Sequence, residues 1–201
     1  MNPNPEPRTE NKNAFTLIEL LVVIAIIAAL AAMIFAAMPA VNASRMKAVA
    51  RAELTQISTA IEAYKARYNN YPPDNRLNPA KPPLYFELTG MLISGGSYKS
   101  LDGSYSVPVG TVNTSFNVDG LVNASTSAQG TDDQRPPENF LKTLKPDQLA
   151  TNGSVRVLIC SADDSVWNYR STNPTNNPNS YDLWIDLVAG GRTNRIANWN
   201  K

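Results

Sequence analysis

The sequence predicts an α+β fold in which one long N-terminal helix packs against a small C-terminal antiparallel β-sheet. Two observations support this prediction. Residues 20–38 form an unbroken apolar run, although the mean hydropathy of the whole chain is only −0.27. Near the C-terminus, apolar and polar residues alternate in two runs separated by a stretch rich in Pro and Asn. A one-sided helix and a one-sided sheet can then cover each other's apolar faces.

The composition excludes many kinds of active site. The chain has 201 residues, with 18 Lys and Arg against 17 Asp and Glu, one cysteine and no histidine. Without histidine it cannot build a Ser-His-Asp triad or a His-ligated metal site. A net charge of +1 offers no surface for a polyanion, so we expect no nucleic-acid partner. Phosphate-binding and dinucleotide-binding glycine motifs are absent from the sequence. We therefore expect a protein that is not an enzyme and has no catalytic residues.

Residues 15–38 are predicted to form a helix that anchors the chain in a membrane once. Residues 1–14 are a polar leader, and no charged residue occurs between Glu19 and Arg45. As a helix, residues 20–38 would span roughly 28 Å, which matches the hydrocarbon core of a bilayer. The alternatives are a buried helix of a soluble protein or a cleavable secretory signal. The rest of the chain is too polar to surround such a helix, and a signal peptide would place a basic region where Glu19 stands.

A second helical segment, residues 39–70, follows without a loop. Its apolar residues recur every three or four positions, as expected for one face of an amphipathic helix. They are Met46, Ala50, Leu54, Ile57, Ile61, Tyr64 and Tyr68. Tyr71-Pro72-Pro73 should end the helix, because a residue that precedes proline disfavours the helical conformation. Residues 71–201 then form the globular domain.

Within the globular domain, the sequence predicts irregular structure first and strands later. Residues 94–135 are rich in Ser, Thr, Asn and Gly, so we expect a long variable loop or a small hairpin over 97–133. Residues 155–159 read as a strand, and residues 167–170 and 181–187 as an antiparallel hairpin. The acidic pairs 132–133 and 163–164 are interpreted as turn residues, since no partner lies at a diagnostic spacing. The single Cys160 is interpreted as a small buried side chain.

The segment from Ala14 through Phe15-Thr16-Leu17-Ile18-Glu19 into the apolar helix resembles the type IV pilin and type II secretion pseudopilin superfamily. The resemblance covers residues 14–68 and implies a pilin-like fold. It further implies that a prepilin peptidase cuts between Ala14 and Phe15 and that the new Phe15 amine is N-methylated. The family prefers Gly where this chain has Ala14.

The same resemblance gives Glu19 a role in assembly. The family interpretation is that Glu19, the fifth residue of the mature chain, pairs with the Phe15 amine of a neighbouring subunit and sets the axial register. An ion pair in a water-poor bundle favours the registers that satisfy both charges. The alternative is a Glu19 side chain that extends to the membrane interface without a partner.

Three C-terminal segments, residues 166–170, 181–184 and 196–199, resemble the major pseudopilin of type II secretion. In that family a loop near the C-terminus usually holds calcium through aspartates. Residues 188–195 form the corresponding loop here and contain no carboxylate, with Asp186 at the edge. Calcium needs several oxygen ligands, normally including anionic ones, so we expect no calcium and no other cofactor. An arginine hydrogen-bonded to loop carbonyls, or the packing of Trp199, would stabilise the loop instead.

Taken together, the resemblance implies a subunit of a type II secretion pseudopilus that drives export across the outer membrane. Its expected partners are further copies of itself, other pseudopilins, the prepilin peptidase, and an inner-membrane assembly platform with its ATPase. The expected location is the bacterial inner membrane, with the C-terminal domain in the periplasm. The alternatives are a type IV pilin for adhesion, motility or DNA uptake, and a singly anchored periplasmic binding protein or enzyme.

Overall fold

The computed structural model describes residues 16–130 and 135–199, and the chain divides into two units, Met1–Val41 and Asn42–Lys201. The expected leader, residues 1–14, lies outside the described residues. The predicted α+β fold, a long N-terminal helix with a small C-terminal antiparallel sheet, is confirmed.

The long helix α1 (Leu17–Tyr68) continues through Pro39 and ends where the sequence predicts. Asn69 takes a left-handed conformation (φ 62°) and donates its backbone N–H to the Lys65 carbonyl at 2.7 Å. This conformation closes the last turn of a helix, and asparagine is one of the few non-glycine residues that adopt it readily.

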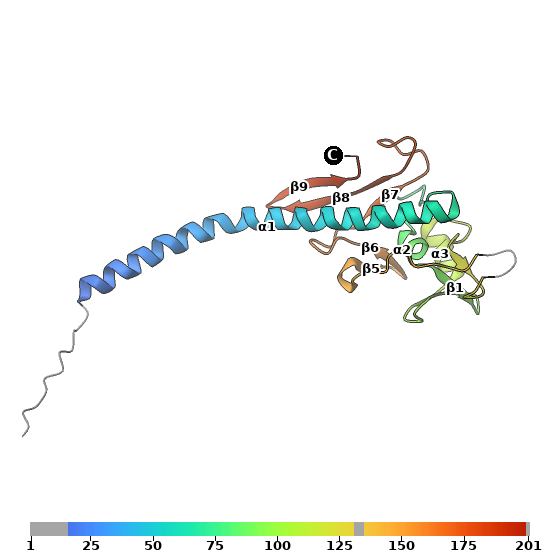
Figure 1. Ribbon diagram of the computed structural model, residues 1–201, viewed down its shortest axis with the longest axis horizontal. Helices are drawn as coiled ribbons and strands as arrows, with labels where there is room; N and C mark the ends of the chain where they lie inside the picture. The colour runs from blue at the N-terminus through green and yellow to red at the C-terminus, as the bar shows by residue number, and fades with distance from the viewer. Residues whose placement is uncertain (1–15, 131–134, 200–201) are drawn as a thin grey trace, which may run out of the picture. The chain divides into compact units, whose positions relative to one another are not determined.

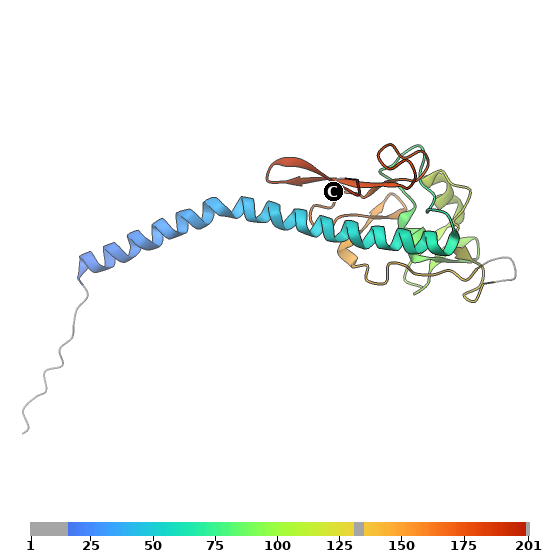
Figure 2. The ribbon, with the colours of Figure 1, turned by 45° about the horizontal axis from the view of Figure 1, so that its top comes forward.

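In the second unit, α1 buries the predicted stripe. Ala50, Ile57, Ile61 and Tyr64 are almost completely buried, and Met46, Leu54 and Tyr68 are half-buried against the same core. Figures 1 and 2 both show β8 and β9 running alongside this part of α1. The helical stripe and the apolar sheet face therefore cover each other, as predicted.

The C-terminal sheet has the order β7-β8-β9 and is antiparallel throughout. Its strands are β7 (Asn168–Arg170), β8 (Asp182–Ala189) and β9 (Arg192–Ala197). Leu183, Ile185 and Leu187 of β8 are fully buried on the helix side. The predicted hairpin of residues 167–170 and 181–187 is confirmed as β7 and β8.

Residues 188–195, expected as a loop, form instead a tight β8–β9 hairpin. Gly190 and Gly191 make the turn, with φ of 62° and 70°, and two consecutive left-handed residues suit the right-handed twist of a two-residue hairpin. Val188 pairs with Thr193 and Ala189 with Arg192. The strands thus continue up to the two glycines.

The middle of the domain is more ordered than its composition suggests. Residues 94–135, expected as a long variable loop or a small hairpin, contain most of a four-stranded sheet of order β3-β2-β1-β4 and the helix α3 (Val109–Phe116). The strands are β1 (Met91–Ser94), β2 (Ser97–Ser100), β3 (Ser106–Pro108) and β4 (Ala124–Ser125), and the short helix α2 (Leu84–Thr89) precedes them. Tyr98, Val107, Val112 and Phe116 from this stretch are buried, so it contributes to the core.

A third, two-stranded sheet lies between these regions in the sequence. It pairs β5 (Leu149–Asn152) with β6 (Val155–Leu158), and the short 3-10 helix η1 (Pro146–Gln148) precedes it. The strand predicted at residues 155–159 is therefore confirmed. Cys160 directly follows and is buried, as predicted, and burial raises the pKa of its thiol to about 12.

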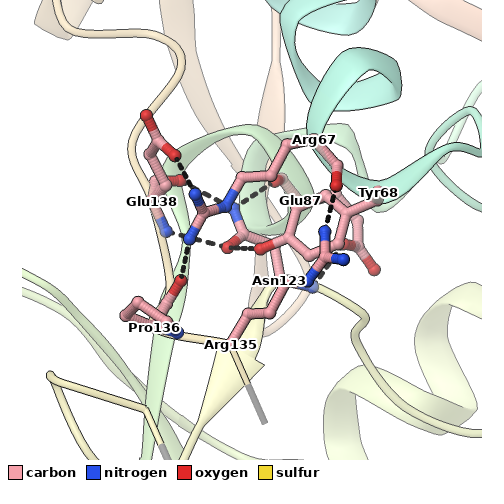
Figure 3. A network of polar contacts seen from close by, with 7 residues as sticks. All are labelled: Arg67, Tyr68, Glu87, Asn123, Arg135, Pro136 and Glu138. Carbon is pink, nitrogen blue, oxygen red and sulfur yellow. Dashed lines mark hydrogen bonds and ion pairs between the residues drawn. The ribbon is translucent and has the colours of Figure 1, made fainter.

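A buried polar network fixes the end of α1 to the rest of the domain (Figure 3). The Glu87 carboxylate, 0% exposed, accepts hydrogen bonds from the Tyr64 hydroxyl at 2.9 Å and from the backbone N–H of Val122 and Asn123 at 2.9 and 3.0 Å. The Asn123 amide donates to the carbonyls of Glu87 and Glu138, both at 2.7 Å. Its oxygen accepts from the Tyr68 hydroxyl at 2.8 Å and from the Glu138 backbone N–H at 2.9 Å.

Two arginines, Arg67 and Arg135, connect the last turn of α1 to residues 135–138. Arg67 pairs with Glu138 at 3.1 Å and donates to the Pro136 carbonyl at 3.0 Å. Arg135 in turn donates to the Arg67 carbonyl, which satisfies an acceptor that the end of a helix leaves unpaired.

Other buried carboxylates organise loops. Asp182, 2% exposed, accepts the backbone N–H groups of Thr175, Asn176 and Asn177 at 2.8–2.9 Å. Asp74 accepts those of Ser171 and Thr172 at 3.0 and 2.9 Å. The Pro- and Asn-rich connection between β7 and β8 is thereby held by two carboxylates.

Candidate functional site

The N-terminus of α1 carries the best-defined site that the sequence predicts. Thr16 precedes the first helical residue, and Glu19 lies in the first turn. The Thr16 backbone N–H and the Thr16 hydroxyl both donate to Glu19 Oε2 at 2.8 Å. In return, the Glu19 backbone N–H donates to Thr16 Oγ1 at 3.3 Å. This reciprocal arrangement is a capping box.

The capping box has a particular value for a helix in lipid. The first N–H groups of any helix have no partner within the helix, and each unsatisfied group costs several kcal/mol in hydrocarbon. Thr16 and Glu19 satisfy two of these donors locally. Sequence analysis identified Glu19 but missed Thr16, although a Thr followed three residues later by a Glu before an apolar run is the known signal of this motif.

The geometry of Glu19 leaves room for another partner. Both donors from Thr16 reach Oε2, and the hydrogen bonds found among the described residues leave Oε1 unoccupied. A carboxylate offers about four lone-pair positions in total. Ala14 and Phe15, the predicted processing residues, lie outside the described residues, so the structure does not place them beside Glu19.

The helix that follows exposes its large apolar side chains in the first unit. Leu17 is 80% exposed, Ile27 59% and Phe35 70%. Within the described part of the chain, α1 is the helix long and apolar enough to cross a membrane. Such a surface needs lipid or other helices around it, which fits single-pass membrane anchoring.

Two carboxylates lie at the C-terminal hairpin, where the family resemblance suggests a calcium site. Asp163 Oδ2 accepts the backbone N–H of Val188 beside the turn at 2.9 Å. Arg195 binds both oxygens of Asp186, the residue opposite it on β8, at 2.7 and 2.8 Å. This ion pair lowers the pKa of Asp186 and raises that of Arg195. Over residues 16–130 and 135–199, no group of three or more His, Cys, Asp or Glu side chains is placed to hold a metal ion.

Two side-chain contacts stabilise the hairpin. The guanidinium of Arg195 joins the two strands, and the Trp199 ring packs edge-on against Trp184, with ring centroids 5.7 Å apart. Arginine and Trp199 were the two stabilising groups expected from the sequence. The arginine was expected to bond to loop carbonyls, whereas Arg195 bonds to the carboxylate of Asp186.

Comparison with known proteins supports the N-terminal assignment. Residues 10–35 match the family described as the prokaryotic N-terminal methylation motif. Neither the curated proteins nor the solved structures contain a match to this chain. The motif covers Ala14, Phe15, the Thr16–Glu19 capping box and the first part of the exposed helix. It supports a type IV pilin-like or pseudopilin subunit that is processed by a prepilin peptidase and assembles with other pilin-like subunits.

Proposed function

We propose that the chain is a structural subunit of a type II secretion pseudopilus, assembled from the inner membrane to drive protein export across the outer membrane. The observation that carries the proposal is the methylation motif over residues 10–35, which leads into a capped apolar helix with exposed large side chains. The role is mechanical, with no catalytic residues. The energy for assembly comes from the ATPase of the inner-membrane platform.

In this proposal the apolar helix has two successive environments. The prepilin peptidase cuts between Ala14 and Phe15 and methylates the new amine. The mature chain is then anchored in the membrane, with its C-terminal domain in the periplasm. On assembly, the lipid around residues 17–41 is replaced by helices of neighbouring subunits, and Glu19 pairs with the Phe15 amine of a neighbour. Because an unpaired charge there is expensive, the pair selects one axial register.

Two features favour a pseudopilus over a pilus. Many type IV pilins close a C-terminal loop with a disulfide, and the single buried Cys160 cannot form one within the chain. The aromatic C-terminal segments, with Trp184 and Trp199 in contact, resemble those of the major pseudopilin. We also propose that the subunit needs no calcium or other cofactor, with the Arg195–Asp186 pair in place of a metal. A type IV pilin remains the second candidate, and a singly anchored periplasmic binding protein the third.

The N-terminal processing is tested by mass spectrometry of the protein from native membranes. We expect a mature terminus at N-methylated Phe15. A terminus near Ala32 or Val41 would mean ordinary secretion of a soluble domain, and the proposal would then fall.

The assembly role is tested with Glu19→Ala, using Glu62→Ala as a matched control on an exposed position of the same helix. We expect Glu19→Ala to leave cleavage largely intact and to abolish filaments in cross-linking assays, with the control unaffected. Normal function after Glu19→Ala, together with a monomer at every concentration in detergent, would favour the singly anchored alternative. Deletion should trap exported proteins in the periplasm, whereas loss of twitching with secretion intact would favour a type IV pilus.

A further inference from the structure

A cleft of about 410 Å³ on the globular unit lies between α2, the 100–104 turn, η1 and β6. It belongs entirely to residues 42–201 and is separate from the N-terminal assembly segment. Three cationic side chains line it, namely Lys142, Lys145 and Arg156, against the single carboxylate of Asp102. The lining therefore carries a formal charge of +2.

Arg156 is held in one orientation by two tyrosines. Its guanidinium carbon lies 4.2 Å from the ring centroid of Tyr105, and its Nη1 donates to the Tyr85 hydroxyl at 2.9 Å. Stacking and a single hydrogen bond use one edge of the guanidinium and leave most of its five N–H donors available. An arginine fixed in this way is already arranged for a planar anion, because little side-chain freedom remains to be lost on binding.

The carboxylate in the lining, Asp102, forms no ion pair with these cations. Asp102 accepts hydrogen bonds from the Ser100 hydroxyl at 2.5 Å and from the Ser104 hydroxyl and backbone N–H at 2.8 and 3.0 Å. These bonds lower the pKa of Asp102 to about 2. The ion pairs found among the described residues are Arg67–Glu138 and Arg195–Asp186, so none of the three cations in the cleft has an acidic partner there.

The lining also has an apolar part, beside polar residues such as Thr89 and Asn139. Four leucines, Leu101, Leu141, Leu144 and Leu149, contribute to the walls. A volume of about 410 Å³ lies within the range of clefts that bind small organic ligands. A bare inorganic anion would satisfy the cations but would leave this apolar wall in water.

We propose that this cleft binds a carboxylate that carries an adjoining apolar group, with Arg156 as the bidentate partner and Lys142 and Lys145 as supporting charges. The ligand chemistry can come from an acidic side chain next to an apolar residue in a protein segment, or from a free organic acid. The proposal is independent of the filament function, since it concerns a cleft on a single subunit.

The test is a titration of the full-length protein in a nonionic detergent, followed by NMR through the side-chain Nε–H signal of Arg156. The probes are the blocked peptide Leu-Asp-Leu-Glu, its amide counterpart Leu-Asn-Leu-Gln, hexanoate and inorganic phosphate. We expect saturable binding of the acidic peptide or hexanoate, at least about tenfold weaker binding of the amide peptide and of phosphate, and weakening by salt. Tighter binding of the peptide identifies a protein segment as the ligand, and tighter or equal binding of hexanoate identifies a free acid.

Variants link the binding to the cleft. Arg156→Lys keeps the charge and should weaken binding at least about tenfold, because the planar fork is lost. Lys142→Gln with Lys145→Gln changes only exposed side chains, so it reports on binding even if Arg156 variants fold poorly. Arg192→Gln, at an exposed position of β9, is the control and should bind as the wild type does. The proposal is overturned by equal binding of acidic and amide peptides, by unchanged affinity in the double lysine variant, or by no saturation up to about 10 mM.

Discussion

The substitution Glu87→Gln tests how the buried network at the end of α1 responds to pH. Glu87 is completely buried, and burial raises its pKa from 4.5 to about 6, although three hydrogen bonds to the carboxylate act in the opposite direction. The groups that face it are the phenols of Tyr64, Tyr68, Tyr98 and Tyr169. Arg67 lies at the outer edge of the network, where it pairs with Glu138.

The sign of the effect follows from proton binding. Between pH 4.5 and about 6, the folded chain holds a proton on Glu87 that the unfolded chain has released. The free energy of unfolding therefore falls as pH rises through this window. A pKa difference of about 1.5, at about 1.36 kcal/mol for each pH unit, corresponds to about 2 kcal/mol from this one group.

Glu87→Gln removes this titration but leaves a neutral side chain of the same shape. Its amide has one accepting oxygen, so either Val122 or Asn123 loses the acceptor of its backbone N–H, at a cost of about 1–3 kcal/mol. The variant should be clearly less stable than the wild type at pH 4. At pH 7 the deficit should be smaller by about 2 kcal/mol, because only the wild type then carries a buried charge.

The assay is urea unfolding of the full-length protein in a nonionic detergent between pH 4 and pH 7. The fluorescence of Trp167, which is fully buried, follows the loss of the globular unit. Glu62→Gln, on an exposed position of α1, controls for the general effect of removing a carboxylate. A wild-type minus Glu87→Gln difference that stays constant from pH 4 to pH 7 would refute the reasoning.

Four further predictions concern three other polar contacts and the response to calcium. Asn123→Asp removes the donors to the Glu87 and Glu138 carbonyls and adds a second carboxylate beside Glu87, so urea unfolding at pH 7 should show a loss of about 2–5 kcal/mol. Asp182→Asn weakens the acceptor of three backbone N–H groups; it should cost about 1–3 kcal/mol and speed hydrogen exchange at residues 175–177. Arg195→Lys breaks the two-bond contact with exposed Asp186 and should cost less than about 1 kcal/mol. Added calcium should leave the unfolding midpoint of the wild type unchanged, whereas a rise would show a bound ion.

The parts of the fold that the sequence predicts well are those with long periodic patterns. The stripe from Met46 to Tyr68 repeats over several helical turns, and β8 alternates over its whole length, so each buries the face that its pattern indicates. Tyr71-Pro72-Pro73 marks the helix end because proline restricts the residue before it.

The middle of the domain was harder to predict for a physical reason. The strands β1 to β4 have only two to four residues each, which is too short for alternation to stand out from a Ser- and Gly-rich background. Their order depends on contacts distant in sequence, such as the parallel pairing of Met91 with Ala124. The role of Asn123 in the network likewise follows from three segments meeting in space, and no local pattern marks it.

The candidate site was likewise predicted only in part. Phe15 and Glu19 were predicted through a resemblance, whereas the capping role of Thr16 was found with the geometry, although the sequence carries its signal. The capping geometry also matters for the proposed assembly. If the cap used both oxygens of the Glu19 carboxylate, neither would be left for the amine of a neighbouring subunit. Thr16 occupies only Oε2 of Glu19, and a carboxylate can accept bonds on both oxygens at once. Glu19 can therefore cap its own helix and still receive the amine of an adjacent subunit through Oε1. In the proposed filament, the helix keeps its capping hydrogen bonds when Glu19 forms this ion pair. The stabilisation by the ion pair is therefore additional to the stabilisation by the cap.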